Sequence, residues 1–457
     1  MEIKNSLTSP ELLPTKDSER DISLLDFTLL WSGMTINIAG FAIGAQLYPG
    51  LSPMKIIYAI LVAYLMVTGL LVLTGDIGIK YGVPFAVYTR ACFGYKGSYI
   101  AGFIRAIPCF FWFGFQTWVG AIALNEVMKM LIGYSNVTLL IILFGAIQII
   151  NAIYGLKAMA KFDWIAIPTL AIVLGAMMFW LLKTHNVTIV DILATPGDNT
   201  APFSFAVMGI AGGWITMALN SPDLTRSLKR SENYENQSFF QRNKNSIIAQ
   251  ILGLVLVGTA ILLVGMTAGI LTGTWNPIDV VIESFGSSKP VVLAFCFLTI
   301  VFAQWSTNTA ANLLPPAYIM LNIFPKLNFV TSTIISGIIG IVILPWKFGN
   351  YLVQFQAITS GLLGPIVGIM ITDYYIIRKQ KLNVKDLYEE GGQYTYKNNF
   401  NPAGMISLFI SFGVAMVFSD YAFFIGFGLS VVLYIILMRT MVLNKYDQKI
   451  GQHIPFD

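Results

Sequence analysis

The chain alternates between long apolar stretches and short polar ones along nearly its whole length. A helix of about 18 to 25 apolar residues matches the thickness of a bilayer. The pattern predicts an all-α membrane protein with twelve transmembrane helices. These spans begin near Phe27, Ile56, Tyr99, Asn136, Phe162, Phe203, Ser246, Pro290, Phe329, Val353, Ala403 and Tyr421.

The composition supports the same class of protein. Apolar residues make up 56% of the 457 residues and charged residues only 11%, whereas soluble domains carry roughly a quarter charged residues. The first 24 residues are polar and of mixed charge, unlike a cleavable signal. We therefore expect a cytoplasmic tail over 1–24, a transporter domain over 25–440 and a second cytoplasmic tail over 441–457.

The basic residues predict the orientation of the chain. With the N-terminus inside, 22 of the 28 Lys and Arg residues fall on the inner segments and 5 on the outer ones. Positive charge collects on the cytoplasmic side of membrane proteins. We expect a multi-pass protein of the plasma membrane with both termini in the cytoplasm, and we expect no nucleic-acid partner.

The stretch "STNTAAN" places polar side chains inside the eighth span. On a helix, Asn308 and Asn312 lie one turn apart. Ala303 and Thr307 are also one turn apart, with Ser306 beside them. Two amides suit a planar hydrogen-bonding solute, while two hydroxyls near a carbonyl suit a small hard cation. A solute site next to a cation site indicates a transporter.

Two tryptophans lie deep in their spans. Trp112 stands one turn before Gln116 in the third span, and Trp214 is central in the sixth. Tryptophan in membrane proteins usually lies at the lipid–water interface, but these two are too deep for that position. Two indoles with an amide rim are typical of a site for a flat heterocycle.

Spans one and six both interrupt their apolar runs with glycine and polar residues. Asn37 and Gly40 interrupt the first span, and the pair Gly212 and Gly213 precedes Trp214 in the sixth. Discontinuous helices five spans apart indicate an inverted repeat with the site at the breaks. Glycine is also common in unbroken membrane helices, where it permits close packing, so the glycines alone leave both interpretations open.

A transported cation would be held by neutral oxygens, because no carboxylate lies at the middle of spans one, six or eight. The hydroxyls of Ser306 and Thr307 with unwound backbone carbonyls suit Na⁺. A proton would need a titrating group, and Glu126, Asp223 and Asp373 lie toward span ends. The two hydroxyls could instead bond back to their own helix.

Five stretches together resemble the nucleobase–cation symporter-1 family, which includes the hydantoin, cytosine, uracil and allantoin permeases. They are "GIKYGVPFAVYTRACFG", "WFGFQTWVG", "GGWITMALNSPDLTR", "STNTAANLLPPAY" and "GLLGPIVGIMITDYYIIRK". The loop "KLNVKDLYEEGGQYTY" and Asn37 favour the allantoin and uracil permeases. The chain departs from the family where Ile38 follows Asn37, a region in which many relatives have proline, and where Phe111 stands before Trp112.

The resemblance implies two five-helix inverted repeats, formed by spans 1–5 and 6–10, and two additional C-terminal helices. It implies a substrate site made of Asn37, Trp112, Gln116, Gly213, Trp214, Asn308 and Asn312. It implies a sodium site made of Gly33, Ile36, Ala303, Ser306 and Thr307. An outer gate is expected near Leu362 and Leu363.

Three hypotheses follow for the function. The first is uptake of a nucleobase or cyclic ureide by alternating access, coupled to Na⁺ or H⁺, without a cofactor; a monomer is compatible with it. The second is a symporter of the same fold for an amino acid or a vitamin such as thiamine. The third, an enzyme or a channel, is disfavoured because the sequence shows no buried acid–base pair, metal cluster or filter motif.

Overall fold

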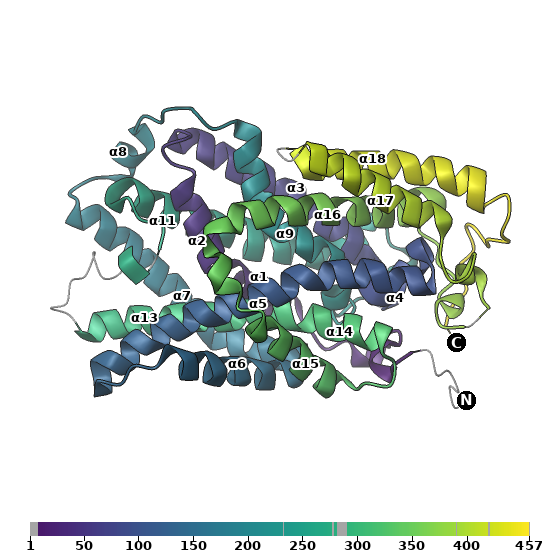
Figure 1. The fold of residues 1–457 in the computed structure, drawn as a ribbon, viewed down its shortest axis with the longest axis horizontal. Coiled ribbons are helices and arrows are strands. Elements are labelled where there is room, and N and C mark those ends of the chain that lie inside the picture. Colours follow the sequence, from purple (N-terminus) through teal and green to yellow (C-terminus); the bar gives the residue numbers. More distant parts are fainter. Residues whose placement is uncertain are drawn as a thin grey trace.

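The computed structural model describes residues 8–231, 233–276, 278–280, 290–389, 391–418 and 421–456, which form a bundle of helices (Figure 1). The first repeat contains α1 (Leu24–Thr35), α2 (Ile38–Gln46), α3 (Pro53–Tyr81), α4 (Phe85–Phe93), α5 (Tyr95–Ile132), α6 (Val137–Ile153) and α7 (Leu156–Thr184). After α8 (Ile189–Ala194) come α9 (Phe203–Thr225), α10 (Phe239–Gln250), α11 (Val257–Thr272), α13 (Pro290–Asn308), α14 (Leu314–Ile323), α15 (Phe329–Val342) and α16 (Leu352–Ile371). The last two helices are α17 (Pro402–Val417) and α18 (Ala422–Leu437).

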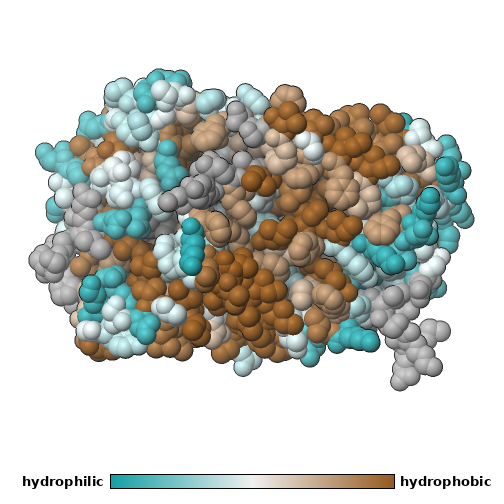
Figure 2. Space-filling view, viewed as in Figure 1, coloured by the Kyte–Doolittle hydropathy of each residue, from teal (hydrophilic) through white to brown (hydrophobic). Residues whose placement is uncertain are grey.

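These helices account for the predicted spans. Among the described residues, eight helical segments are long and apolar enough to cross a bilayer, and the bent pair α1 and α2 adds a ninth. Three shorter apolar helices, α6, α15 and α17, complete the set. Figure 2 shows apolar side chains across the middle of one face and hydrophilic ones gathered at its two ends, as a bilayer requires.

Both termini lie at the same end of the molecule, near α4 (Figure 1). The described parts of the predicted tails pack onto that end. The Thr15 backbone N–H donates to the Gly82 carbonyl at 3.0 Å, and the Val384 N–H donates to the Ile454 carbonyl at 2.8 Å. A shared end for the termini agrees with an even number of spans.

The packing repeats itself between the two halves of the chain. In the first half α1 contacts α7, and in the second α9 contacts α16. Helix α2 packs on α11 just as α9 packs on α3, so span one meets span seven where span six meets span two. If each span of one repeat is exchanged for its counterpart in the other repeat, each contact named here becomes the other contact of its pair. This exchange symmetry is what an inverted repeat produces.

Span one is broken, as expected. Helices α1 and α2 meet at 52°. The Asn37 side chain accepts a hydrogen bond from the Gly40 N–H at 2.9 Å and donates to the Met34 carbonyl at 2.9 Å. Asn37 therefore caps α2 while it closes the end of α1. Asn37 therefore marks the break and also supplies hydrogen-bond partners to the backbone groups on both sides of it.

Span six is not broken, and the expected interruption at Gly212 and Gly213 is wrong. Helix α9 runs without a gap over Phe203–Thr225, all of which the structure describes. A Cβ added to Gly212 would lie 2.9 Å from the Ser360 Oγ of α16. Gly212 therefore permits close packing against α16, the alternative role that glycine has in membrane helices.

Candidate substrate and cation site

A cavity of about 70 Å³ lies at the centre of the bundle, beside the break between α1 and α2. Its walls come from both halves of the chain, which places it at the interface of the two repeats. Six of the seven predicted substrate residues line it: Asn37, Trp112, Gln116, Gly213, Trp214 and Asn312. The two spans that carry the tryptophans are far apart in sequence and both contribute to its wall.

Aromatic neighbours support both indoles. Trp112, 8% exposed, meets Phe111 edge to face, with ring centroids 5.6 Å apart. Trp214, 9% exposed, lies 6.2 Å from the ring of Trp31 and 6.5 Å from that of Tyr64. Neither indole faces the lipid, and each keeps a surface on the cavity.

Phe111 has a role that the sequence left undefined. Its ring stacks on Phe355 of α16, with centroids 3.8 Å apart and planes inclined by 21°. Phe355 also meets Trp112 edge to face at 6.4 Å. The phenylalanine before Trp112 thus joins α5 to α16 and holds the indole from one side.

Gln116 and Asn308 differ in how their amides are satisfied. The Gln116 Oε1 is buried without a hydrogen-bond partner among the described residues, and its side chain lines the cavity. The Asn308 Nδ2 donates to the Phe113 carbonyl at 2.9 Å and to Gln148 at 2.8 Å. Asn308 is fully buried and does not line the cavity, so its amide bonds to groups within the bundle.

Asn308 also orients Asn312. The Asn312 Nδ2 donates to the Asn308 Oδ1 at 2.8 Å. Between α13 and α14 the chain makes a π-helical turn over Thr309–Leu313, in which the hydrogen-bond step is one residue longer than in an α-helix. The predicted amide pair on one face of span eight is present, with one amide holding the other at the cavity wall.

The oxygens predicted to hold a cation lie together at the break of span one. The Thr307 hydroxyl donates to the Gly33 carbonyl at 3.0 Å and to the Ile36 carbonyl at 3.3 Å. The Ser306 hydroxyl lies beside Gly33, because a Cβ added there would approach its Oγ to 2.1 Å. Ala303 lies one turn before Thr307 and is buried. Thr307 also lines the central cavity, so the cation cluster adjoins the solute site.

A charged side chain beside these oxygens was not expected from the sequence. Asp163 of α7 accepts a hydrogen bond from the Ser306 Oγ at 2.5 Å and is 2% exposed. A carboxylate from span five therefore lies beside the oxygens of Ser306 and Gly33, where the sequence had led us to expect neutral oxygens only. The signal was present in "KFDWIAIP", where one acidic residue enters an apolar run.

Leu362 and Leu363 do not line the central cavity, although they lie on α16. Leu363 is fully buried. Helix α16 reaches the cavity through Gln356, nearer its N-terminal end. The contact of Phe355 with Phe111 lies next to Gln356, so the part of α16 that covers the cavity precedes the predicted pair of leucines.

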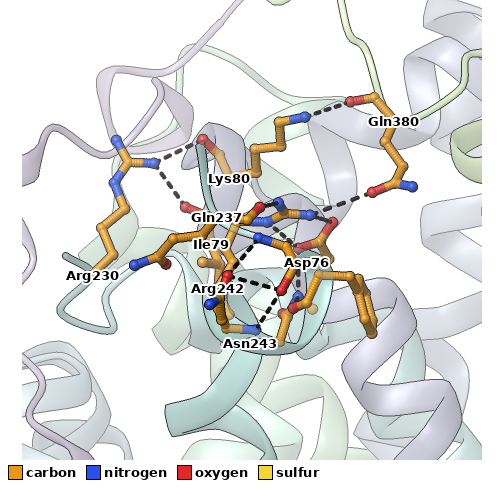
Figure 3. A network of polar contacts seen from close by, with 12 residues as sticks. Asp76, Ile79, Lys80, Arg230, Gln237, Arg242, Asn243 and Gln380 are labelled. Carbon is orange, nitrogen blue, oxygen red and sulfur yellow. Dashed lines mark hydrogen bonds and ion pairs between the residues drawn. The ribbon is translucent and has the colours of Figure 1, made fainter. Parts of the chain in front are cut away.

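A buried polar network lies at the end of the bundle that carries the termini (Figure 3). Asp76 of α3 is fully buried and accepts from Arg242 of α10 through Nε at 2.7 Å and Nη2 at 2.8 Å. The Asn243 amide and the Tyr374 hydroxyl also donate to it, at 2.7 and 3.0 Å. The network joins α3, α10 and the segment after α16 at this end of the bundle.

Comparisons with known proteins identify the family. A family model for permeases for cytosine/purines, uracil, thiamine and allantoin matches residues 14–441. A structure of Mhp1, a nucleobase–cation-symport-1 family transporter in a closed conformation with bromovinylhydantoin bound, superposes with a TM-score of 0.92. The two chains are 32% identical, over 96% of this chain and 97% of that one. The chain belongs to the nucleobase–cation symport-1 family.

Curated relatives agree with this assignment. The hydantoin permease of Microbacterium maritypicum is 32% identical over 442 residues, covering 96% of this chain and 90% of the relative. The allantoin permease of Bacillus subtilis is 31% identical over 478 residues, covering 95% and 94%. The predictions of a multi-pass membrane transporter, of a permease rather than an enzyme, and of the inverted-repeat fold are confirmed. As a symporter family, it couples transport to a cation.

Gly33→Ala is expected to abolish binding of the cation, because the new Cβ would lie 2.1 Å from the Ser306 Oγ and 2.8 Å from the Asp163 Oδ1. Contacts this short force the Ser306 and Asp163 side chains to move. Binding of ²²Na⁺ to the purified variant measures the effect. Gly69→Ala is the control, since no atom lies within 4 Å of its added Cβ. Cation affinity in Gly33→Ala equal to that of Gly69→Ala would contradict the placement of the site.

Proposed function

We propose that this permease takes up a small planar nucleobase or cyclic ureide, of the hydantoin, allantoin, uracil or cytosine type, together with Na⁺. Transport proceeds by alternating access around the central cavity. The observation that carries the proposal is the cavity in which Trp112 and Trp214 both present a face. Gln116 and Asn312 supply donors and acceptors at its rim.

The size of the cavity supports a small ring over a larger solute. The cavity is small, with a volume of about 70 Å³. A single five- or six-membered ring matches that size better than a two-ring vitamin such as thiamine. A free amino acid would leave two indole faces without a flat partner.

Uptake assays test the proposal. The chain is expressed in a host that lacks purine, pyrimidine and ureide uptake, and radiolabelled hydantoin, allantoin, uracil, cytosine, thiamine and phenylalanine are supplied with Na⁺ or with K⁺ in its place. We expect saturable uptake of at least one single-ring heterocycle that is lost without Na⁺. Saturable uptake of thiamine or phenylalanine alone would replace the proposal, and flux without saturation would indicate a channel.

Orientation and domain limits are part of the proposal. The excess of Lys and Arg on alternate segments supports cytoplasmic termini in the plasma membrane, with tails over 1–24 and 441–457 around a transporter domain over 25–440. In this orientation the network around Asp76 lies on the cytoplasmic side. The site lies within one chain, which supports a monomer as the functional unit.

Gln116→Leu is expected to weaken binding of the heterocycle about tenfold to a hundredfold without lowering stability. The cavity loses an amide that reads the ring edge, while the unpaired buried Oε1 is removed. Asn308→Leu is the contrasting variant, because it breaks bonds to Phe113, Gln148 and Asn312 and should lower the unfolding temperature. Binding isotherms and thermal unfolding separate the two effects. Equal losses of stability would show that Gln116 is also structural.

A further inference from the structure

Asp163 places a buried carboxylate inside a membrane span. Among the described residues, this carboxylate takes part in one hydrogen bond. Its side chain is on α7 and is 2% exposed. Ser306 donates to its Oδ1, and no other hydrogen bond to its carboxylate is found among the described residues. A carboxylate offers about four lone-pair positions, so one hydroxyl leaves most of its capacity unused.

No basic side chain compensates this charge in the part of the chain that the structure describes. Lys157, on the same helix, pairs with Asp21 at 3.0 Å, and Lys161 is exposed. The buried ion pairs of the protein, Asp76 with Arg242 and Asp373 with Arg378, are formed elsewhere. An isolated buried carboxylate is costly unless a counter-ion accompanies it. The surroundings of Asp163 therefore lack a positive charge.

The same position is rich in oxygen. An added Cβ on Gly33 would lie 2.8 Å from the Asp163 Oδ1 and 2.1 Å from the Ser306 Oγ, so both groups meet the backbone of α1 just before its break. One residue beyond Ser306, Thr307 bonds the carbonyls of Gly33 and Ile36. Both hydroxyl hydrogens point to oxygen acceptors, which leaves their lone pairs for an ion.

We propose that Asp163 is an anionic ligand of the coupling cation and binds it directly alongside Ser306, Thr307 and the carbonyls of Gly33 and Ile36. The inference deepens the proposed function, because it rests on the cation site of that proposal. A ligand set with one charge and several neutral oxygens suits an alkali cation. The carboxylate adds a charge that the hydroxyls and carbonyls do not have, so it sets the affinity for the ion.

Binding of ²²Na⁺ to the full-length protein in lipid nanodiscs, without any organic substrate, tests this inference. Asp163→Asn keeps an oxygen that accepts from Ser306 but removes the charge. We expect the Kd for Na⁺ to rise about a hundredfold. Asp191→Asn removes an exposed carboxylate on α8 and should leave the Kd unchanged. Ser306→Ala keeps the charge and should cost less than Asp163→Asn.

The outcomes are distinct. A Kd for Na⁺ in Asp163→Asn within about twofold of the parent's would show that Asp163 only orients Ser306, and it would overturn the proposal. A parent protein that shows no saturable binding of ²²Na⁺ would overturn it as well. If Asp163→Asn does not fold, Asp163→Glu replaces it. A ratio of Li⁺ to Na⁺ affinity in Asp163→Glu equal to that of the parent would count against direct ligation by this side chain. Saturable Na⁺ binding in a protein that transports none of the tested rings would refute the proposed substrate class alone.

Discussion

Replacing Trp112 with alanine is expected to lower the affinity for the heterocycle by about tenfold to a hundredfold. Stacking of a flat ring on an aromatic side chain is worth roughly 1–3 kcal/mol, and each 1.4 kcal/mol is a factor of ten in Kd. Trp112 lines the cavity and is supported by Phe111 and Phe355, so no neighbour replaces its face. Equilibrium binding of a radiolabelled ring to purified protein measures the change.

Trp118→Ala is the matched control. Trp118 lies on the same helix, and its ring packs 5.5 Å from that of Phe115, but it does not line the central cavity. We expect its affinity for the ring to stay within about twofold of the parent. If the two variants bind the ring equally well, the assignment of Trp112 to the substrate site is wrong.

Arg242→Ala is expected to lower the free energy of unfolding by about 3–5 kcal/mol, the usual cost of removing one partner from a buried ion pair. The Asp76 carboxylate is fully buried and would lose two hydrogen bonds from the guanidinium. The loss also loosens this end of the bundle, because the pair joins α3 to α10. Thermal unfolding in detergent, with labelling of that end by a water-soluble reagent, measures both consequences.

An exposed ion pair provides the comparison for Arg242. Lys157 and Asp21 are 3.0 Å apart, with side chains 58% and 42% exposed, so Lys157→Ala should cost less than about 1 kcal/mol. The double variant Asp76→Ala with Arg242→Ala should lose less than the sum of the two single changes, because no unpaired charge remains. Equal losses in Arg242→Ala and Lys157→Ala would show that the network does not hold this end together.

Residues close together on one helix were predictable, because helical periodicity places them on one face. Asn308 and Asn312 form the expected pair, and Ser306 and Thr307 both reach the break of span one. Asn37 was identified at that break because it interrupts the apolar run of span one. Local features of this kind need only the sequence, since they depend on spacing within a single span.

Contacts between distant spans were not predictable in the same way. Asp163 and Ser306 are 143 residues apart, and no periodicity relates α7 to α13. Gln356 rather than Leu362 or Leu363 reaches the cavity, because the tilt and depth of α16 decide which turn faces inward. Gly212 and Gly213 were equally suited to a broken helix and to close packing until the position of α16 was known.

The sequence by itself determined that this chain crosses a membrane many times and which side chains are too polar for lipid. These properties follow from the free energy of transfer between water and hydrocarbon, which each segment obeys separately. Only the tertiary structure decided which polar groups lie together, that the Asn308 amide holds Asn312, and that the carboxylate of Asp163 lies beside Ser306. Such outcomes depend on how helices pack against one another, and that is a property of the whole bundle.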